Sequence, residues 1–328
     1  MEKAKYYEVL ADGKIRCLLC PQNCIIAENR KGFCRARENL KGELYSTNYG
    51  RISSYGLDPM EKKPLYHFYP GSTIFSIGTI GCNFRCPFCQ NWQISQIEDR
   101  ETIQFTPQKI VSLAKSFEGN IGIAYTYSEP LIWYEYVYET ARLVKESGLV
   151  NVLVTNGFIE EEPLKELLPY IDAMNIDVKG FSQEFYKEYT KGDIGPVKRT
   201  VELAHKNCHV EVTTLLISGL NDSEKEIESL CSWLASLRKD IPLHLSRYFP
   251  NYKMDLPATS LDTMERAYDT ASKYLEYVYL GNVRSKRNNT YCPQCGALLI
   301  DRQYFANIVG ITGNGICASC GKDINIVM

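Results

Sequence analysis

The feature that most constrains the fold is an alternation of short β-rich runs with longer amphipathic stretches between residues 73 and 282. The predicted strands are 73–82, 122–127, 151–157, 173–180, 209–219, 241–249 and 277–282. The predicted helices are 106–117, 130–147, 223–239 and 260–276. We expect the first to start at Thr106 and the third at Asp222-Ser223. Strand–helix–strand repetition indicates parallel strands with helical crossovers. We therefore predict an α/β fold, a partial (β/α)6-type TIM barrel, with its chemistry at the carboxyl ends of the strands.

Two cysteine-rich regions flank this predicted core. The prediction divides the chain into an N-terminal Cys-rich region (1–72), the barrel (73–282) and a C-terminal module (283–328), with a polar linker at 282–290. The first residues are charged and lack the apolar stretch of a signal peptide, and no run of about 18 apolar residues could span a membrane. With thirteen cysteines, the chain is expected to be cytoplasmic, where clustered thiols bind metal more often than they form disulfides. The net charge of −2 disfavours a nucleic-acid partner.

Three cysteines lie on one short stretch, Gly81–Asn91, which reads GCNFRCPFCQN. The spacing Cys82-x3-Cys86-x2-Cys89 lacks a fourth cysteine nearby. Three thiolates can hold three irons of a [4Fe–4S] cluster and leave the fourth iron open to an exchangeable ligand. A zinc site completed by a distant histidine, or three buried thiols without a metal, are the alternatives that spacing alone leaves open.

The same stretch resembles the signature of the radical S-adenosylmethionine (SAM) superfamily, including the aromatic Phe88 before the last cysteine. The resemblance extends over about 73–282 and is strongest to glycyl-radical-enzyme activases such as the pyruvate formate-lyase activating enzyme. The segment 45–96 is similar to one subgroup, the AmmeMemoRadiSam system radical SAM enzymes. The resemblance implies that a reduced [4Fe–4S] cluster cleaves SAM to a 5′-deoxyadenosyl radical, which abstracts hydrogen from a substrate that the sequence does not identify.

The resemblance also implies which residues bind SAM. Glu129, with the backbone near Ser128, lies in YTYSEP, where the family has a Gly-Gly-Glu-like element, so this chain departs from the glycines. An ordinary Glu-Pro turn is the alternative there. The other implied SAM contacts are Asn91, Thr155, Asn156, Asp177, Lys179, Thr213, Leu215 and Arg247. For Thr155 and Asn156 the alternative is a simple Asn-Gly turn, and for Asp177 and Lys179, which share one strand face, it is a structural ion pair.

Two further groups contain four cysteines each. Cys292, Cys295, Cys317 and Cys320 form two Cys-x2-Cys-Gly knuckles, the pattern of a structural zinc ribbon. The N-terminal group consists of Cys17, Cys20, Cys24 and Cys34. Its spacing suits either zinc, which we expect first, or a second Fe–S cluster.

The expected activity is thus that of a radical SAM oxidoreductase that uses a [4Fe–4S] cluster, SAM and structural Zn²⁺. A glycyl-radical-enzyme activase is one alternative function, and a metal-binding docking scaffold without catalysis is another. Expected partners are a reductant such as ferredoxin or flavodoxin and, from the subgroup resemblance, proteins of the Memo and AMMECR types.

Overall fold

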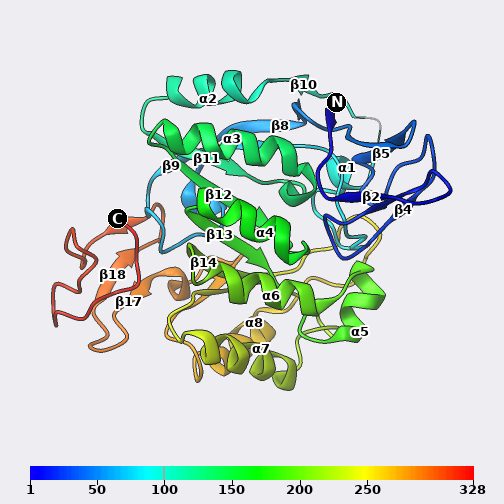
Figure 1. Ribbon diagram of the computed structural model, residues 1–328. Helices are drawn as coiled ribbons and strands as arrows, with labels where there is room; N and C mark the ends of the chain where they lie inside the picture. Colours follow the sequence, from blue (N-terminus) through cyan, green and yellow to red (C-terminus); the bar gives the residue numbers. More distant parts are fainter. Residues whose placement is uncertain (99) are drawn as a thin grey trace.

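The central element is an eight-stranded sheet in the order β16-β15-β14-β13-β12-β11-β9-β8, as a computed structural model of residues 1–98 and 100–328 describes it. Its strands are β8 (Ser54–Pro59), β9 (Thr73–Gly78), β11 (Asn120–Tyr125), β12 (Val150–Thr155), β13 (Ala173–Asp177), β14 (His209–Leu216), β15 (Leu243–Arg247) and β16 (Val278–Gly281). Strands β9 and β11 to β16 are parallel, and β8 pairs antiparallel with β9 at one edge. The sheet curls without closing, so the predicted partial barrel is confirmed (Figure 1). The division at 72/73 and 282/283 stays a prediction.

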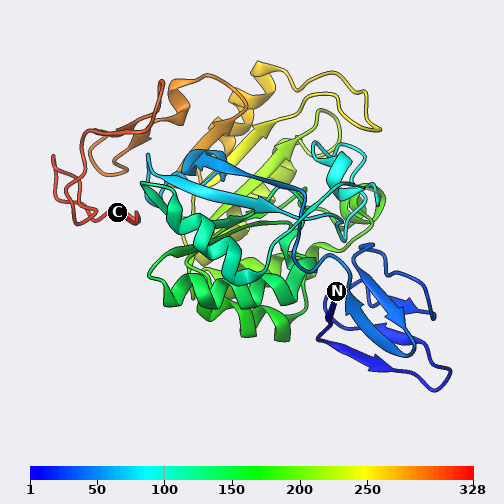
Figure 2. The same cartoon turned by 90° about the horizontal axis from the view of Figure 1, so that it is seen from above.

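Helices follow the strands and cover the sheet (Figures 1 and 2). The longer ones are α2 (Pro107–Ser116), α3 (Tyr134–Glu146), α4 (Glu161–Leu167), α6 (Ile194–Ala204), α7 (Glu224–Leu237) and α8 (Leu261–Ala271). Short turns are η1 (Met60–Lys62), α1 (Trp92–Ser95), η2 (Pro130–Trp133), η3 (Leu168–Tyr170), α5 (Gln183–Phe185), η4 (Tyr186–Thr190) and η5 (Lys286–Asn288). The predicted starts are confirmed, because the side chains of Thr106 and Ser223 accept hydrogen bonds from the amides of Lys109 and Glu226. The predicted helix 130–147 begins as the separate turn η2, whereas α4 and α6 were not predicted.

The N-terminal region contains small antiparallel sheets at the carboxyl end of the barrel strands (Figure 2). One sheet contains β1 (Glu2–Lys3), β6 (Glu43–Ser46) and β5 (Arg37–Leu40), and another contains β2 (Tyr7–Val9), β3 (Ile15–Cys17) and β4 (Ile25–Ile26). Strand β7 (Arg51–Ile52) pairs with β10 (Ile103–Gln104), which follows the cysteine loop in the chain. A buried ion pair between Arg37 and Glu135 joins this region to α3.

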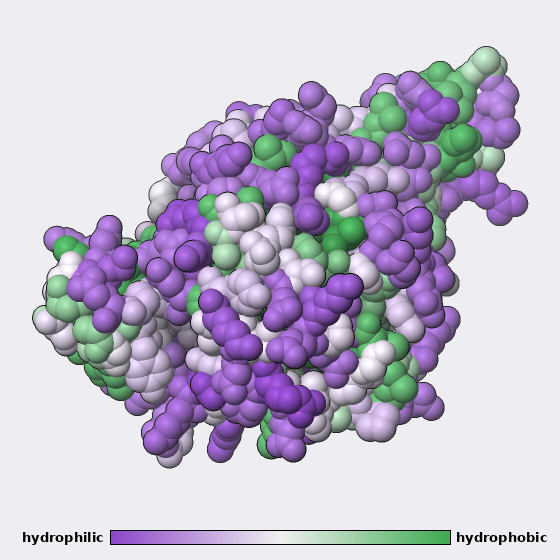
Figure 3. Space-filling model, turned by 90° about the horizontal axis from the view of Figure 1, so that it is seen from below, coloured by the Kyte–Doolittle hydropathy of each residue, from purple (hydrophilic) through white to green (hydrophobic). Residues whose placement is uncertain are grey.

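The C-terminal module lies at the opposite end of the barrel (Figure 1). It contains β17 (Thr290–Tyr291), β18 (Leu298–Asp301) and β19 (Asn307–Ile308). An isolated bridge joins Val327 to Phe68, and the guanidinium of Arg302 donates to the carbonyl oxygen of Tyr66 at 2.6 Å. In the space-filling view both regions stand out from a largely hydrophilic body with scattered apolar areas (Figure 3).

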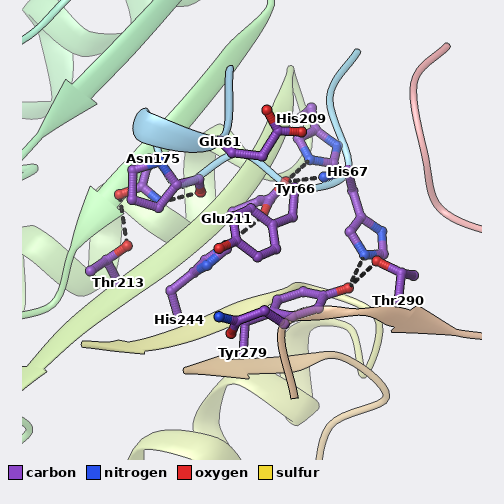
Figure 4. A network of polar contacts seen from close by, with 12 residues as sticks. Glu61, Tyr66, His67, Asn175, His209, Glu211, Thr213, His244, Tyr279 and Thr290 are labelled. Carbon is purple, nitrogen blue, oxygen red and sulfur yellow. Dashed lines mark hydrogen bonds and ion pairs between the residues drawn. The ribbon is translucent and has the colours of Figure 1, made fainter. Parts of the chain in front are cut away.

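A buried polar network lies near the amino-terminal ends of the barrel strands (Figure 4). The carboxylate of Glu211, which is fully buried, contacts Nε2 of His209 at 3.0 Å and Nε2 of His244 at 2.6 Å. It also accepts the backbone amide of His67 at 2.7 Å. The His67 ring contacts Asn325 of the C-terminal module, and its other nitrogen meets the Tyr279 hydroxyl at 2.6 Å. The network therefore ties the segment 64–69 and the C-terminal module to the barrel.

Candidate active site

The three-cysteine loop begins where β9 ends. Gly81 has a φ of +95°, and a Cβ at this position would lie 2.5 Å from the carbonyl oxygen of Cys34. Only glycine fits both this conformation and this close approach. The loop is thereby held against the N-terminal region, and its three thiols lie at the carboxyl end of the barrel.

The loop and the strand ends enclose one cavity of about 350 Å³. The predicted residues that line it are Cys82, Cys86, Cys89, Asn91, Ser128, Glu129, Thr155, Asn156, Asp177, Lys179, Thr213 and Leu215. They come from the loop and from the ends of β11, β12, β13 and β14, as expected for chemistry at the carboxyl face of a barrel. The structure thus brings together the three thiols and nine of the ten predicted SAM-contact residues. Their contacts with SAM stay predictions.

Arg247 is the predicted residue that does not line the cavity. Its Nε donates to the carbonyl oxygen of Thr259 at 2.6 Å, and its guanidinium lies over the Phe249 ring. Alternation along β15 explains this, because Ser246 points into the cavity and its neighbour must point away.

Sequence reasoning missed several lining residues, among them Lys62, Pro64 and Tyr127. Lys62 and Pro64 precede the predicted barrel, and no local pattern places the segment 60–64 beside strand ends that follow it by more than sixty residues. Tyr127 carried a usable signal, because it occupies the first position of the family's Gly-Gly-Glu-like element.

Tyr127 adopts a φ of +69°, the left-handed conformation that favours glycine. Its hydroxyl donates to Asp58 at 2.7 Å, and Lys63 contacts both that carboxylate and the face of the Tyr127 ring. Its carbonyl oxygen accepts from the side-chain amide of Asn91 at 2.6 Å. The chain therefore keeps a glycine-like backbone without glycine, and these contacts offset the strain.

Hydrogen-bond donors face the thiol of Cys82. The Phe84 amide lies 3.3 Å and the Asn156 side-chain amide 3.7 Å from its sulfur, and Cys89 contacts the Ser95 hydroxyl at 3.2 Å. Burial raises the pKa of Cys82 well above its ordinary value and that of Cys86 to about 12. Bare thiolates are therefore disfavoured here, and bound iron would supply the compensating charge.

Glu129 organises the ends of two strands. One carboxylate oxygen accepts from the Leu131 amide at 2.9 Å and the Thr155 hydroxyl at 2.6 Å, and the other accepts from the Asn156 amide at 2.8 Å. Burial raises the pKa of Glu129 to about 7, although these three donors act in the opposite direction. The carboxylate thus fixes the β12 end and still borders the cavity.

Asp177 and Lys179 form an ion pair of 2.8 Å inside the cavity, as their shared strand face predicts. Burial lowers the pKa of Lys179, but the carboxylate of Asp177 and the nearby thiol of Cys86 raise it above its ordinary value. A charged pair in a cavity wall can orient a polar ligand that carries both an ammonium and a carboxylate group.

These residues fit a [4Fe–4S] cluster with one open iron. Among the described residues that line the cavity, no fourth cysteine and no histidine accompanies the triad. Three of the four histidines lie instead in or around the Glu211 network. The three-thiol donor set with adjoining polar space suits an open-site cluster, and the histidine-completed zinc alternative finds no ligand here.

The C-terminal cysteines converge on one point. The sulfurs of Cys292 and Cys320 lie 3.6 Å apart, and those of Cys295 and Cys317 lie 3.7 Å apart. Four thiolates about 2.3 Å from a tetrahedral zinc ion would be separated by about 3.8 Å, so this group fits a single metal ion.

Comparisons with known proteins agree with this geometry. The family model described as "Radical SAM superfamily" matches residues 76–234. The chain is 45% identical to the uncharacterized protein MJ0808 of Methanocaldococcus jannaschii over the full length of both proteins. It is 23% identical to the pyruvate formate-lyase-activating enzyme of Clostridium pasteurianum, over 51% of this chain and 72% of that relative.

Among solved structures, SuiB of Streptococcus suis bound to S-adenosylmethionine shares the fold with a TM-score of 0.52 and 14% identity. The match covers 68% of this chain and 53% of SuiB. Within the described part of the chain, no helix has both the length and the apolar character needed to span a membrane. The sequence match and the activase relative show that the chain belongs to the radical SAM superfamily and is an enzyme of its activase-like type.

Proposed function

We propose that Cys82, Cys86 and Cys89 hold the [4Fe–4S] cluster of this radical SAM enzyme and that the adjoining cavity binds SAM at the open iron. The observation that carries the proposal is the cavity itself, in which the three thiols face polar side chains from four strand ends. A closed structural site would need a fourth protein ligand, whereas an open site needs room for an exchangeable one.

When both are bound, the reduced cluster and SAM supply the deoxyadenosyl radical characteristic of the family. The chain's own contribution is to position and enclose SAM. In this proposal the Asp177–Lys179 pair orients the charged methionyl end, and Glu129 holds the backbone near Ser128 and Asn156 in place for it. Thr213 and Leu215, on β14, line the part of the cavity that holds the adenosyl portion of SAM. Asn156 also donates toward the Cys82 sulfur, and such hydrogen bonds tune a cluster's potential.

The substrate class rests on the resemblance of residues 45–96. We propose a small molecule or an amino-acid residue handled together with Memo-type and AMMECR-type proteins, and a low-potential ferredoxin or flavodoxin as the reductant. The activase relatives support a second candidate, a glycine in a partner protein. We also propose zinc at the four C-terminal cysteines, supported by their sulfur spacing.

The test is anaerobic reconstitution with iron and sulfide, reduction with dithionite, and chromatography for 5′-deoxyadenosine after addition of SAM. Protein carrying Cys82→Ala, Cys86→Ala and Cys89→Ala serves as the comparison. A Cys208→Ala variant is the matched control, because this thiol lies outside all three groups and bonds to the Ala204 carbonyl. We expect product from the wild type and the control and none from the triple variant.

Equal product from the triple variant would refute the assignment of the cluster ligands. Product from the wild type with unchanged SAM affinity in Asp177→Asn and Lys179→Met variants would refute the assignment of the methionyl contacts. The cluster and SAM parts of the proposal can therefore fail separately.

A further inference from the structure

The N-terminal cysteines line one narrow hollow. It is bordered by Cys17, Cys20, Cys24 and Cys34 together with Arg37 and a few apolar side chains. Three of the four cysteines are buried and Cys24 is half-buried. The Phe33 amide lies 3.3 Å from the sulfur of Cys24. Amides directed at sulfur are typical of ligating thiolates, so the hollow is built as a metal site.

Sulfur spacing distinguishes this group from the C-terminal one. Within the described chain, the C-terminal group is the set whose ligand atoms all lie within 4.8 Å of one another. No three of the N-terminal sulfurs reach that mutual distance, and neither do those of the catalytic triad. A cubane of four irons and four sulfides is wider than one ion, so the thiolates that hold it stand farther apart. The sulfurs of the N-terminal group, like those of the triad, are thus gathered less tightly than the four of the zinc-like site.

An unpaired buried donor borders the hollow. Arg37 is 1% exposed; its other nitrogens bond to the Lys5 carbonyl and to Glu135, but its Nε has no acceptor among the described residues. A buried donor without a partner costs about 1–3 kcal/mol. The inorganic sulfides of a cluster would add hydrogen-bond acceptors beside this guanidinium, whereas a zinc ion would bring no acceptor beyond the four thiolates.

The hollow is in direct contact with the catalytic loop. The Cys34 carbonyl packs against Gly81, and the Arg85 guanidinium donates to the carbonyl oxygens of both Cys82 and Phe33. Arg85 therefore lies between the two sets of thiols. The backbone of Cys34 in the N-terminal group thus touches the backbone of Gly81, the residue before Cys82 of the catalytic triad.

From these contacts we infer that Cys17, Cys20, Cys24 and Cys34 bind a second, fully ligated [4Fe–4S] cluster beside the catalytic one. This reverses the first expectation of zinc at these residues. Four protein ligands leave no open iron, so this cluster does not bind SAM. Its position beside the catalytic loop predicts magnetic coupling between the two reduced clusters.

The first experiment uses the full-length chain carrying Cys82→Ala, Cys86→Ala and Cys89→Ala, reconstituted anaerobically. Iron, sulfide and zinc are counted, and Mössbauer and EPR spectra are recorded with and without SAM. We expect about four irons and four sulfides per chain and a reduced EPR signal that SAM does not alter. Adding Cys20→Ser and Cys24→Ser removes this iron, whereas adding Cys208→Ser leaves it.

The second experiment compares the fully reduced wild type with the sum of the spectra from the two single-site proteins. Broadening or splitting beyond that sum confirms that the clusters are neighbours, and a simple sum refutes their contact. A triad variant that retains about two zinc ions and no iron overturns the inference. The triad variant keeps all four N-terminal cysteines, so its metal content does not depend on whether the Cys20→Ser and Cys24→Ser protein folds. Its metal content also does not test the assignment of the catalytic cluster ligands, which can therefore fail separately.

Discussion

Replacing Glu211 with alanine tests whether the buried polar network holds the segment 64–69 and the C-terminal module against the barrel. The carboxylate is fully buried and takes three contacts, with the His67 amide at 2.7 Å and with the rings of His209 and His244 at 3.0 and 2.6 Å. Glu211→Ala leaves all three groups without their shared partner inside a protein interior. Removing one member of a buried, hydrogen-bonded charge network costs about 3–5 kcal/mol.

The assay is chemical and thermal unfolding of the reconstituted protein, followed by circular dichroism. For a chain of this size, the loss corresponds to a fall in Tm of about 4–7 °C. Glu211→Gln keeps the shape and one acceptor oxygen, so we expect a smaller loss of about 1–3 kcal/mol. The matched control is Glu224→Ala, an exposed carboxylate 3.8 Å from Lys273, which is expected to change stability by less than about 0.5 kcal/mol.

The reasoning is refuted if Glu211→Ala unfolds within about 1 kcal/mol of the wild type. In that case water or a rearranged histidine would replace the carboxylate. The network would then not be what attaches the segment 64–69 to the barrel. Hydrogen exchange of residues 64–69 and 325–327 provides an independent reading, because faster exchange there is expected only if the network anchors both segments (Figure 4).

Three further predictions concern pH, helix capping and metal content. Burial raises the pKa of Glu211, but the His209 and His244 contacts outweigh it and hold this pKa well below the ordinary value of 4.5. The unfolded chain therefore binds more protons, so the wild type's advantage over Glu211→Gln should be fully present above pH 4.5 and be lost progressively as the pH falls through the lower pKa of the folded state. An advantage that survives in acid, measured by urea titration at several pH values, would contradict this. Thr106→Ala removes the cap of α2 and should cost about 1 kcal/mol in the same titration, whereas Thr106→Ser should cost little. Cys320→Ala should remove about one zinc ion per chain by metal analysis and leave iron unchanged; a loss of iron instead would show that this group holds iron.

The sequence by itself determined the features that depend on neighbouring residues. The pattern of apolar residues predicted all seven parallel strands, because a strand buried in a sheet appears in the sequence as a run of a few consecutive apolar residues. The Cys82–Cys89 spacing placed three thiols on one short loop for the same reason, since they lie on eight consecutive residues, and the family resemblance then predicted a cluster there. The resemblance implied Asp177, Lys179, Thr155 and Asn156 as SAM contacts, and their positions at predicted strand ends placed them at one face of the barrel.

Tertiary structure alone decided the features that depend on distant segments. The direction of Arg247, the return of Lys62 and Pro64 to the cavity, and the meeting of His67 with Glu211 join residues far apart in the chain. We likewise infer the metal at Cys17, Cys20, Cys24 and Cys34 from the arrangement of sulfurs in space rather than along the sequence. Local patterns record which face of an element is buried, whereas packing between elements sets the distances that a bound metal requires.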